Sequence, residues 1–324
     1  MSASTLSGLK LGVLDFCMLA PGQHPSDRLA ETLDLAAEVD RLGYTRYWLS
    51  EHHTTDVAHA SPELLVPLIL GRTRRLRAGP AGILLRYYSP FKVADTFRSL
   101  EALFPGRVDL GTARGIADPA TAAALLDGAT EPAGAYERKV GDLVGYVRGS
   151  LPNGHPGADA QVSASGVGPA EVWVLGSSAN SGALAARHGT ALSVGLFLQN
   201  AATTASPEIV ERYRAAFQPV AELPEPRWSL AVAGICAETF EGAVEILKQH
   251  QNPFIVPSVF GTPGQCWDRL EYLAAQYQTD EIVFAALGRS HQDRLNAYRL
   301  LAQEAAGRQQ ADLPRGGAPS VAVA

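Results

Sequence analysis

Three titratable side chains, Glu51, His52 and His53, end a short apolar run that begins at Tyr47, within a candidate strand at 45–50. An amphipathic pattern precedes that segment, and this order is typical of a helix followed by a buried strand. Polar groups at the carboxyl end of a parallel strand lie where α/β enzymes carry out chemistry, and histidine titrates near neutral pH. Glu51 and His52 are therefore candidate catalytic residues. The alternative is a histidine hydrogen-bonded within a loop for structural reasons.

The direction of these side chains limits what they can bind. Alternation along a strand sends Glu51 and His53 to one side and His52 to the other. Adjacent histidines therefore rarely share a metal ion, and no cysteine or further carboxylate lies at a ligand spacing beside them. We expect no metal at this site.

A second group ends the segment 108–115, where Gly111 and Gly115 flank Arg114. Glycines let the backbone approach a ligand, and the planar guanidinium group matches the geometry of a phosphate. The alternative is an ion pair between Arg114 and a neighbouring carboxylate, Asp109 or Asp118.

A third group consists of Ser177, Ser178 and Ser181, between an apolar segment and a helical one. Such hydroxyl groups can simply cap a helix, but free N–H groups at a helix start also form an anion site. If Arg114 reaches the same end of the sheet, the two groups favour a phosphorylated cofactor or substrate.

The segment 77–85 is apolar but contains Gly79, Pro80 and Gly82. Glycine within a strand indicates a bulge or the close approach of a ligand, and a flat ring would need such a small-residue surface. The alternative is a strand that ends in a turn at Gly79 and Pro80.

Apolar segments and helical patterns alternate along the whole chain. Strands are predicted at 9–16, 45–50, 77–85, 108–112, 171–175, 191–196, 228–236 and 281–286, and helices at 27–42, 62–73, 91–103, 136–149, 181–188, 207–217, 240–249, 263–276 and 292–305. Eight strand–helix alternations predict an α/β protein with a closed (β/α)8 TIM barrel. The rival, an open doubly wound sheet, would normally carry GxGxxG after its first strand, and this chain does not.

We expect residues 1–306 to form a single barrel domain and the Gly-, Pro- and Gln-rich residues 307–324 to be a disordered tail. Two segments do not fit the repeat. Residues 152–169 are rich in Gly, Pro, Ala and Asp, and residues 199–206 form a polar loop after the sixth strand.

The composition is that of a soluble globular protein: 324 residues, 46% hydrophobic and 19% charged, with a net charge of −6. Acids and bases are interspersed, so we expect no nucleic-acid partner. No apolar run reaches the roughly 18 residues that span a membrane, and the amino terminus does not read as a signal peptide. The three cysteines are far apart, which favours reduced thiols and a cytoplasmic location.

Taken together, the motifs resemble those of the bacterial luciferase-like flavin monooxygenase family. The similar segments follow one another in order: WLSEHH at 48–53 and SP at 61–62, RAG at 77–79 and YSP at 88–90, GRVDLGTARG at 106–115, LGSS at 175–178 and LAARHG at 184–189, and GTP at 261–263 with DRL at 268–270. The similarity covers about 9–305. Each piece is weak, but the ordered set is specific.

The resemblance implies a (β/α)8 barrel that binds FMN at the carboxyl ends of its strands. By matching positions, Arg114 and the serines 177, 178 and 181 would hold the FMN phosphate. The bond between Ala81 and Gly82 falls where relatives carry a non-proline cis peptide beneath the flavin ring. His52 matches the active-site histidine. Luciferases themselves carry a reactive cysteine where this chain has Ala113, which argues against light emission.

The chain shows no evident nicotinamide site, so we infer a two-component system in which a separate reductase supplies reduced FMN. Oxygen would add to the flavin C4a, and the resulting peroxide would oxygenate a small organic substrate, with His52 as general acid or base. The resemblance also implies a homodimer and a role among tailoring enzymes of antibiotic or polyketide biosynthesis. The alternatives are a deazaflavin-dependent oxidoreductase, a non-catalytic flavin-binding protein and a metal-dependent barrel hydrolase.

Overall fold

The computed structural model describes residue 6 and residues 8–312, except 116, 165, 199–204, 251 and 254. Its strands form one parallel sheet with the order β3-β2-β1-β10-β8-β7-β6-β5-β4, and β9 pairs with β8. The strands are β1 (Lys10–Asp15), β2 (Arg46–Leu49), β3 (Arg77–Pro80), β4 (Ile83–Leu84), β5 (Asp109–Ala113), β6 (Glu171–Gly176), β7 (Ala191–Gly195), β8 (Trp228–Cys236), β9 (Val259–Gly261) and β10 (Glu281–Ala286).

This sheet is a barrel, because its two ends belong to the same stretch of chain. The strand predicted at 77–85 is interrupted at Ala81 and Gly82, so that β3 pairs with β2 while β4 pairs with β5. A further bridge joins Ala78 to Val108, and the Ala78 N–H donates to the Arg107 carbonyl at 2.9 Å. The predicted TIM barrel is thereby confirmed, and the open doubly wound sheet is excluded.

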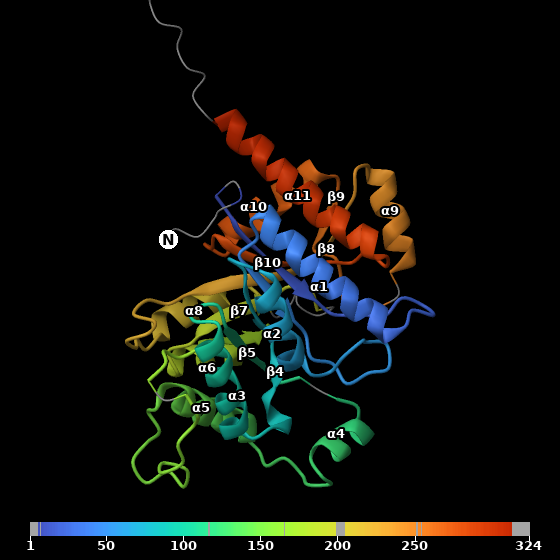
Figure 1. The fold of residues 1–324 in the computed structure, drawn as a ribbon. Coiled ribbons are helices and arrows are strands. Elements are labelled where there is room, and N and C mark those ends of the chain that lie inside the picture. The colour runs from blue at the N-terminus through green and yellow to red at the C-terminus, as the bar shows by residue number, and fades with distance from the viewer. Residues whose placement is uncertain are drawn as a thin grey trace, which may run out of the picture.

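The helices lie outside the barrel (Figure 1). They are α1 (Pro25–Leu42), α2 (Pro62–Arg72), α3 (Pro90–Leu103), α4 (Pro119–Leu125), α5 (Ala135–Arg148), α6 (Ala179–Arg187), α8 (Glu208–Ala216), α9 (Phe240–Gln249), α10 (Pro263–Gln276) and α11 (His291–Asp312), with a 3-10 turn, η1, at Leu85–Tyr87. Two short elements, α4 and β9, were not expected from the sequence. Helix α11 continues to Asp312, so the tail predicted from position 307 is helical at its start, and 313–324 lie outside the described residues.

The core has two parts, as a closed barrel requires. Apolar side chains that point outward from the strands pack against the helices in one large cluster that includes Leu11, Val39 and Leu301. Those that point inward form a second cluster around Trp48 and Trp173, whose rings meet edge to face at 5.1 Å between centroids. The barrel interior is therefore filled with side chains below its mouth.

Charged residues close the amino-terminal end of the barrel. The Arg46 guanidinium group, 1% exposed, lies 2.5 Å from an Asp109 oxygen and 2.6 Å from a Glu281 oxygen, and it stacks on Trp48 and Trp173. Arg46, Asp109 and Glu281 are the first residues of β2, β5 and β10. This network is therefore at the opposite end from the carboxyl ends of the strands, and we assign it to stability.

The segment 152–169 is irregular in its described residues, as predicted, but it is held in place. Arg98 of α3 donates hydrogen bonds to the carbonyls of Val147, Ala164 and Val167, and Asp95 accepts from the Ser163 N–H. Most of the predicted loop at 199–206 lies outside the described residues. Within the described part of the chain, no helix has the length and apolar character needed to cross a membrane.

Candidate active site

Glu51 lies just beyond β2 and is 3% exposed. One carboxylate oxygen accepts hydrogen bonds from the His53 ring at 2.8 Å and the Tyr88 hydroxyl at 2.7 Å, and the other accepts from the Leu84 N–H at 3.0 Å. Burial raises the pKa of Glu51, while these three hydrogen bonds oppose the rise. With its acceptor positions occupied in this way, Glu51 connects the end of β2 to β4 and to the residues after η1.

The side chain of His52 takes no part in these contacts of Glu51. Strand alternation predicted that Glu51 and His53 lie on one side and His52 on the other. The His52 ring lies 6.2 Å from the ring of Phe16, which follows β1, and the side chain is exposed at the barrel mouth. The walls of the mouth nevertheless remove enough water to lower the pKa of His52 below its ordinary value, and Asp56 only partly opposes this. His52 is therefore mostly neutral at pH 7 and able to accept a proton.

Arg114 is exposed just beyond β5. The two carboxylates that could have neutralised it are engaged elsewhere: Asp109 with Arg46 in the barrel floor, and Asp118 with the N–H groups of Ala120 and Thr121. Among the described residues, Arg114 forms no ion pair within 4.0 Å. Its guanidinium group is thus available to a ligand.

The three serines lie where the next strand, β6, passes into α6. Ser178 is the N-cap of α6, and its hydroxyl accepts from the Ser181 N–H at 3.4 Å and lies 3.1 Å from the Ser181 hydroxyl. Gly176 leaves room for this arrangement, since a Cβ there would come within 2.0 Å of the Ser181 oxygen. Because β5 and β6 are paired, Arg114 and this helix start face the same edge of the barrel mouth. This donor set fits a phosphate group.

One expectation about the third strand is wrong. The bond between Ala81 and Gly82 is trans. The Ala81 N–H donates to the Leu49 carbonyl at 2.7 Å, so the trans bond already allows the sheet pairing, and trans is the form favoured by about 3–4 kcal/mol. The small residues here fit strand contact, because a Cβ on Gly82 would lie 2.5 Å from that of Ala113.

The aromatic residues considered for a substrate pocket have different roles. Phe197 packs edge to face on Phe16 at 5.4 Å between centroids, and the Phe16 ring lies 6.2 Å from that of His52. The Tyr88 hydroxyl donates to Glu51, and the Tyr87 hydroxyl accepts from the Ala117 N–H at 3.1 Å. Phe197 is therefore linked to His52 through Phe16, whereas the two tyrosine hydroxyls have partners elsewhere.

A cavity of about 580 Å³ opens at the barrel mouth, and its lining includes Phe16, whose ring lies 6.2 Å from that of His52. It is bounded by the segment after β1, the start of α1, the loop between β10 and α11, and the loop after α9. In the part of the chain that the structure describes, no group of three or more His, Cys, Asp or Glu side chains could hold a metal ion.

This arrangement can be compared with known proteins. The family model described as luciferase-like monooxygenase matches residues 9–320. The chain belongs to the luciferase-like monooxygenase family. It is 31% identical to the uncharacterised Bacillus subtilis protein YwcH, with 92% of this chain and 99% of the relative covered. It is also 31% identical to the N-acetyl-S-alkylcysteine monooxygenase of the same organism, over 76% of this chain and 74% of that one.

Solved structures of other proteins have the same fold. Apo-MsnO8 is 31% identical, covers 91% of this chain and 98% of its own, and has a TM-score of 0.80. Two more distant structures show the fold alone: the oxygenating component of 3,6-diketocamphane monooxygenase of Pseudomonas putida in complex with FMN, at 16% identity and a TM-score of 0.67, and an F420-dependent secondary alcohol dehydrogenase, at 13% and 0.68. They cover 91% and 92% of this chain and 96% and 99% of their own. The predicted family and the class of enzyme are confirmed.

Sequence reasoning about this luciferase-like monooxygenase missed the cavity at the barrel mouth. Its buried polar wall contains Asp15, Arg28 and Arg294, which come from opposite ends of the chain. A signal existed for one of them: Asp15 is a carboxylate near the carboxyl end of the predicted strand at 9–16, as Glu51 is at the end of the next one.

Proposed function

We propose that this chain is an FMN-dependent monooxygenase that oxygenates a small organic substrate with reduced FMN and O2. The observation that carries the proposal is the placement of two groups at the same edge of the mouth. Arg114, which is exposed and forms no ion pair among the described residues, follows β5, and the start of α6 follows the adjacent strand β6. Reduced FMN would supply the electrons that activate dioxygen. Because this chain shows no evident nicotinamide site, we infer that a separate reductase supplies the reduced flavin, and we place both in the cytoplasm.

The side chains then divide into two roles. Arg114, Ser177, Ser178 and Ser181 would bind the phosphate, with Ala81 and Gly82 as the strand segment nearest the ring. His52 would hold or move a proton at the mouth, since it is neutral at pH 7 and exposed there. The sequence suggested a catalytic role for Glu51, but its three hydrogen bonds favour a positioning role.

The test is an anaerobic titration of the purified protein with reduced FMN, followed by a pulse of oxygen labelled with ¹⁸O. We expect saturable binding and reoxidation that is slower than that of free reduced FMN. With a substrate present, one labelled atom should enter the product; an N-acetyl-S-alkylcysteine is a first choice because of the B. subtilis relative. Binding of reduced deazaflavin in preference to reduced FMN would instead favour hydride transfer without oxygen.

The phosphate site has a test of its own. Replacing Arg114 with Gln should weaken binding of reduced FMN by about tenfold or more, because hydrogen bonds to charged groups contribute about 1.5–3 kcal/mol. Binding of reduced riboflavin, which lacks the phosphate, should not change. The control is Arg138→Gln, which alters an exposed arginine bonded to the Ala133 carbonyl. Equal losses for FMN and riboflavin in Arg114→Gln would contradict the assignment.

We further propose a homodimer formed through α2 and α3. These helices expose Leu64, Leu68 and Leu103 at 68%, 51% and 69%, and Leu64 and Leu68 lie one turn apart on one face. Large apolar side chains grouped on a surface commonly mark a protein interface. Sedimentation at micromolar concentration should give the mass of two chains, and a monomer at that concentration would contradict the proposal.

A further inference from the structure

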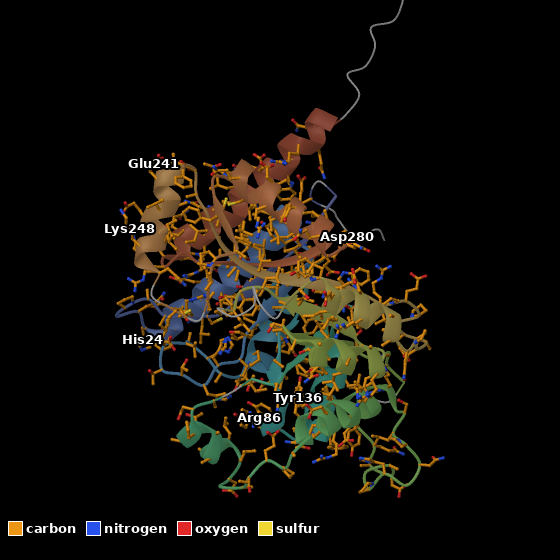
Figure 2. The ribbon with its side chains drawn as sticks, turned by 180° about the vertical axis from the view of Figure 1, so that it is seen from behind. His24, Arg86, Tyr136, Glu241, Lys248 and Asp280 are labelled. Carbon is orange, nitrogen blue, oxygen red and sulfur yellow. The ribbon has the colours of Figure 1, made fainter. Side chains whose placement is uncertain are left out.

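The cavity at the barrel mouth extends from there to the space between α1 and α11. These two helices pack side by side although they lie near opposite ends of the chain (Figure 1). In Figure 2, His24 before α1 and Lys248 of α9 lie on the same side of the view, and Asp280, which precedes β10, lies on the other. The lining residues 14–17 and 286–288 lie at and just beyond the carboxyl ends of β1 and β10, so the cavity opens at that end of the barrel. Its volume, about 580 Å³, is in the range of small-molecule sites.

The end of the cavity at the barrel mouth is apolar. Leu14, Phe16 and Leu287 line it, and all three belong to the cluster that fills the barrel interior. Phe16 is also the residue whose ring lies 6.2 Å from His52. A molecule bound here would therefore have its apolar part next to the proposed proton-transfer residue.

The other end of the cavity is lined by arginines. Arg28 of α1 is 1% exposed and Arg294 of α11 is 6% exposed, and Arg289 lines the same wall. Arg28 is already neutralised by Asp15, to which it forms a buried ion pair. Arg294 donates to Glu31 at 2.6 Å and to the carbonyls of Gly288 and Arg289, but its Nε, although buried, has no hydrogen-bond partner in the described structure.

Arg294 forms an ion pair with Glu31 at 2.6 Å, and Glu31 lies outside the lining of the cavity. Burial and repulsion from Arg28 lower the pKa of Arg294, and this outweighs the attraction of Asp15 and Glu31. The residues that line the cavity include three arginines and two aspartates, Asp15 and Asp56, and Glu31 adds a carboxylate from outside the lining. The first turns of α1 and α11 also follow the loops that bound this wall, and the positive ends of their helix dipoles add to its potential.

From these observations we infer that the cavity is the substrate site and that the substrate carries a carboxylate, bound by Arg294 and Arg289 between α1 and α11. The apolar part of the substrate, which contains the atom to be oxidised, lies against Phe16 near His52. The role of this site as a substrate site rests on the proposed monooxygenase function, but binding of a carboxylate there can be tested without flavin or oxygen.

The experiment compares two probes of the same length, octanoate and octanamide, by calorimetric titration of the full chain. We expect octanoate to bind about tenfold or more tightly than octanamide, because charge-assisted hydrogen bonds to a carboxylate are roughly twice as strong as neutral ones. Arg289→Gln and Arg294→Gln should each reduce the preference for the carboxylate. The matched control is Arg299→Gln, since Arg299 lies on the same helix but pairs with Glu38 at 2.7 Å outside the cavity.

Arg289→Gln keeps the proposal testable if the buried Arg294 is needed for folding. Equal affinity for the two probes in the wild type would overturn the assignment, as would an unchanged preference in Arg289→Gln. An equal loss of preference in Arg299→Gln would show a general charge effect and would also overturn it. Because none of these titrations contains flavin, their failure is distinct from failure of the reduced-FMN experiment.

Discussion

Replacement of Arg46 with Met should lower the free energy of unfolding by about 3–5 kcal/mol, the usual cost of removing one partner from a buried ion pair. Arg46 is 1% exposed and neutralises Asp109 and Glu281, which are 0% and 2% exposed. Methionine of similar length would fill the space between the indole rings but would leave both carboxylates without this cation. Urea denaturation at pH 7 measures the loss, and Arg46→Lys should recover part of it.

The loss of stability in Arg46→Met should depend on pH, and the pKa of Asp109 gives the direction. Burial alone would raise the pKa of Asp109, but Arg46 and Arg77 lower it overall. A depressed carboxyl pKa stabilises the fold above the unfolded value, near 3.9, and that contribution is lost as the pH falls through the folded value. The difference between wild type and Arg46→Met should therefore be largest above about pH 4 and shrink in acid. A difference that grows in acid would contradict the role given to Arg46.

The control for Arg46→Met is an arginine at the surface. Arg41 pairs with Glu38 at 2.9 Å, but its side chain is 69% exposed. Water and salt screen such a pair, so Arg41→Met should leave the free energy of unfolding close to the wild-type value. A similar loss in both variants would show that the burial of Arg46 is not what matters.

Most strands of the barrel were predictable from sequence because a short, mainly apolar run lies between two helical patterns. The features that sequence reasoning did not predict are mainly those whose conformation depends on contacts with other elements of the fold. The interruption at Ala81 and Gly82 exists because β3 and β4 pair with different strands, and a close contact with Ala113 requires a small residue there. Helix α4 buries none of its residues, so its sequence carries no amphipathic signal.

For the candidate site, the sequence predicted which of its residues lie on the same side of a strand, but not the contacts with other strands that fix their positions. That His53 and Glu51 share a side follows from their spacing. The contact of Glu51 with Leu84 does not, because it depends on how β2 and β4 are arranged in the closed barrel. The same is true of the wall shared by Arg28 and Arg294, whose helices are adjacent only once β1 and β10 have paired.

Replacement of His52 with Ala should lower the oxygenation rate by about 10²–10⁴-fold, the usual contribution of a positioned acid or base. Binding of reduced FMN should be unchanged, since Arg114 and the start of α6 are separate from this residue. The wild-type rate should decline as the pH falls below the pKa of His52, which is lower than its ordinary value of about 6.5. His52→Ala should lack this decline. Oxygenation at the wild-type rate would show that His52 has no such role.

Glu51→Gln separates the positioning role from proton transfer. Glutamine keeps the shape but has only one acceptor oxygen, so it cannot serve the Leu84 N–H, the Tyr88 hydroxyl and the His53 ring together. Strand β4 and the residue after η1 would lose an anchor, and we expect a lower melting temperature and weaker binding of reduced FMN. The decline of the rate in acid should remain, because His52 is still present. If Glu51→Gln instead removed that decline and left flavin binding intact, Glu51 rather than His52 would be the residue that titrates.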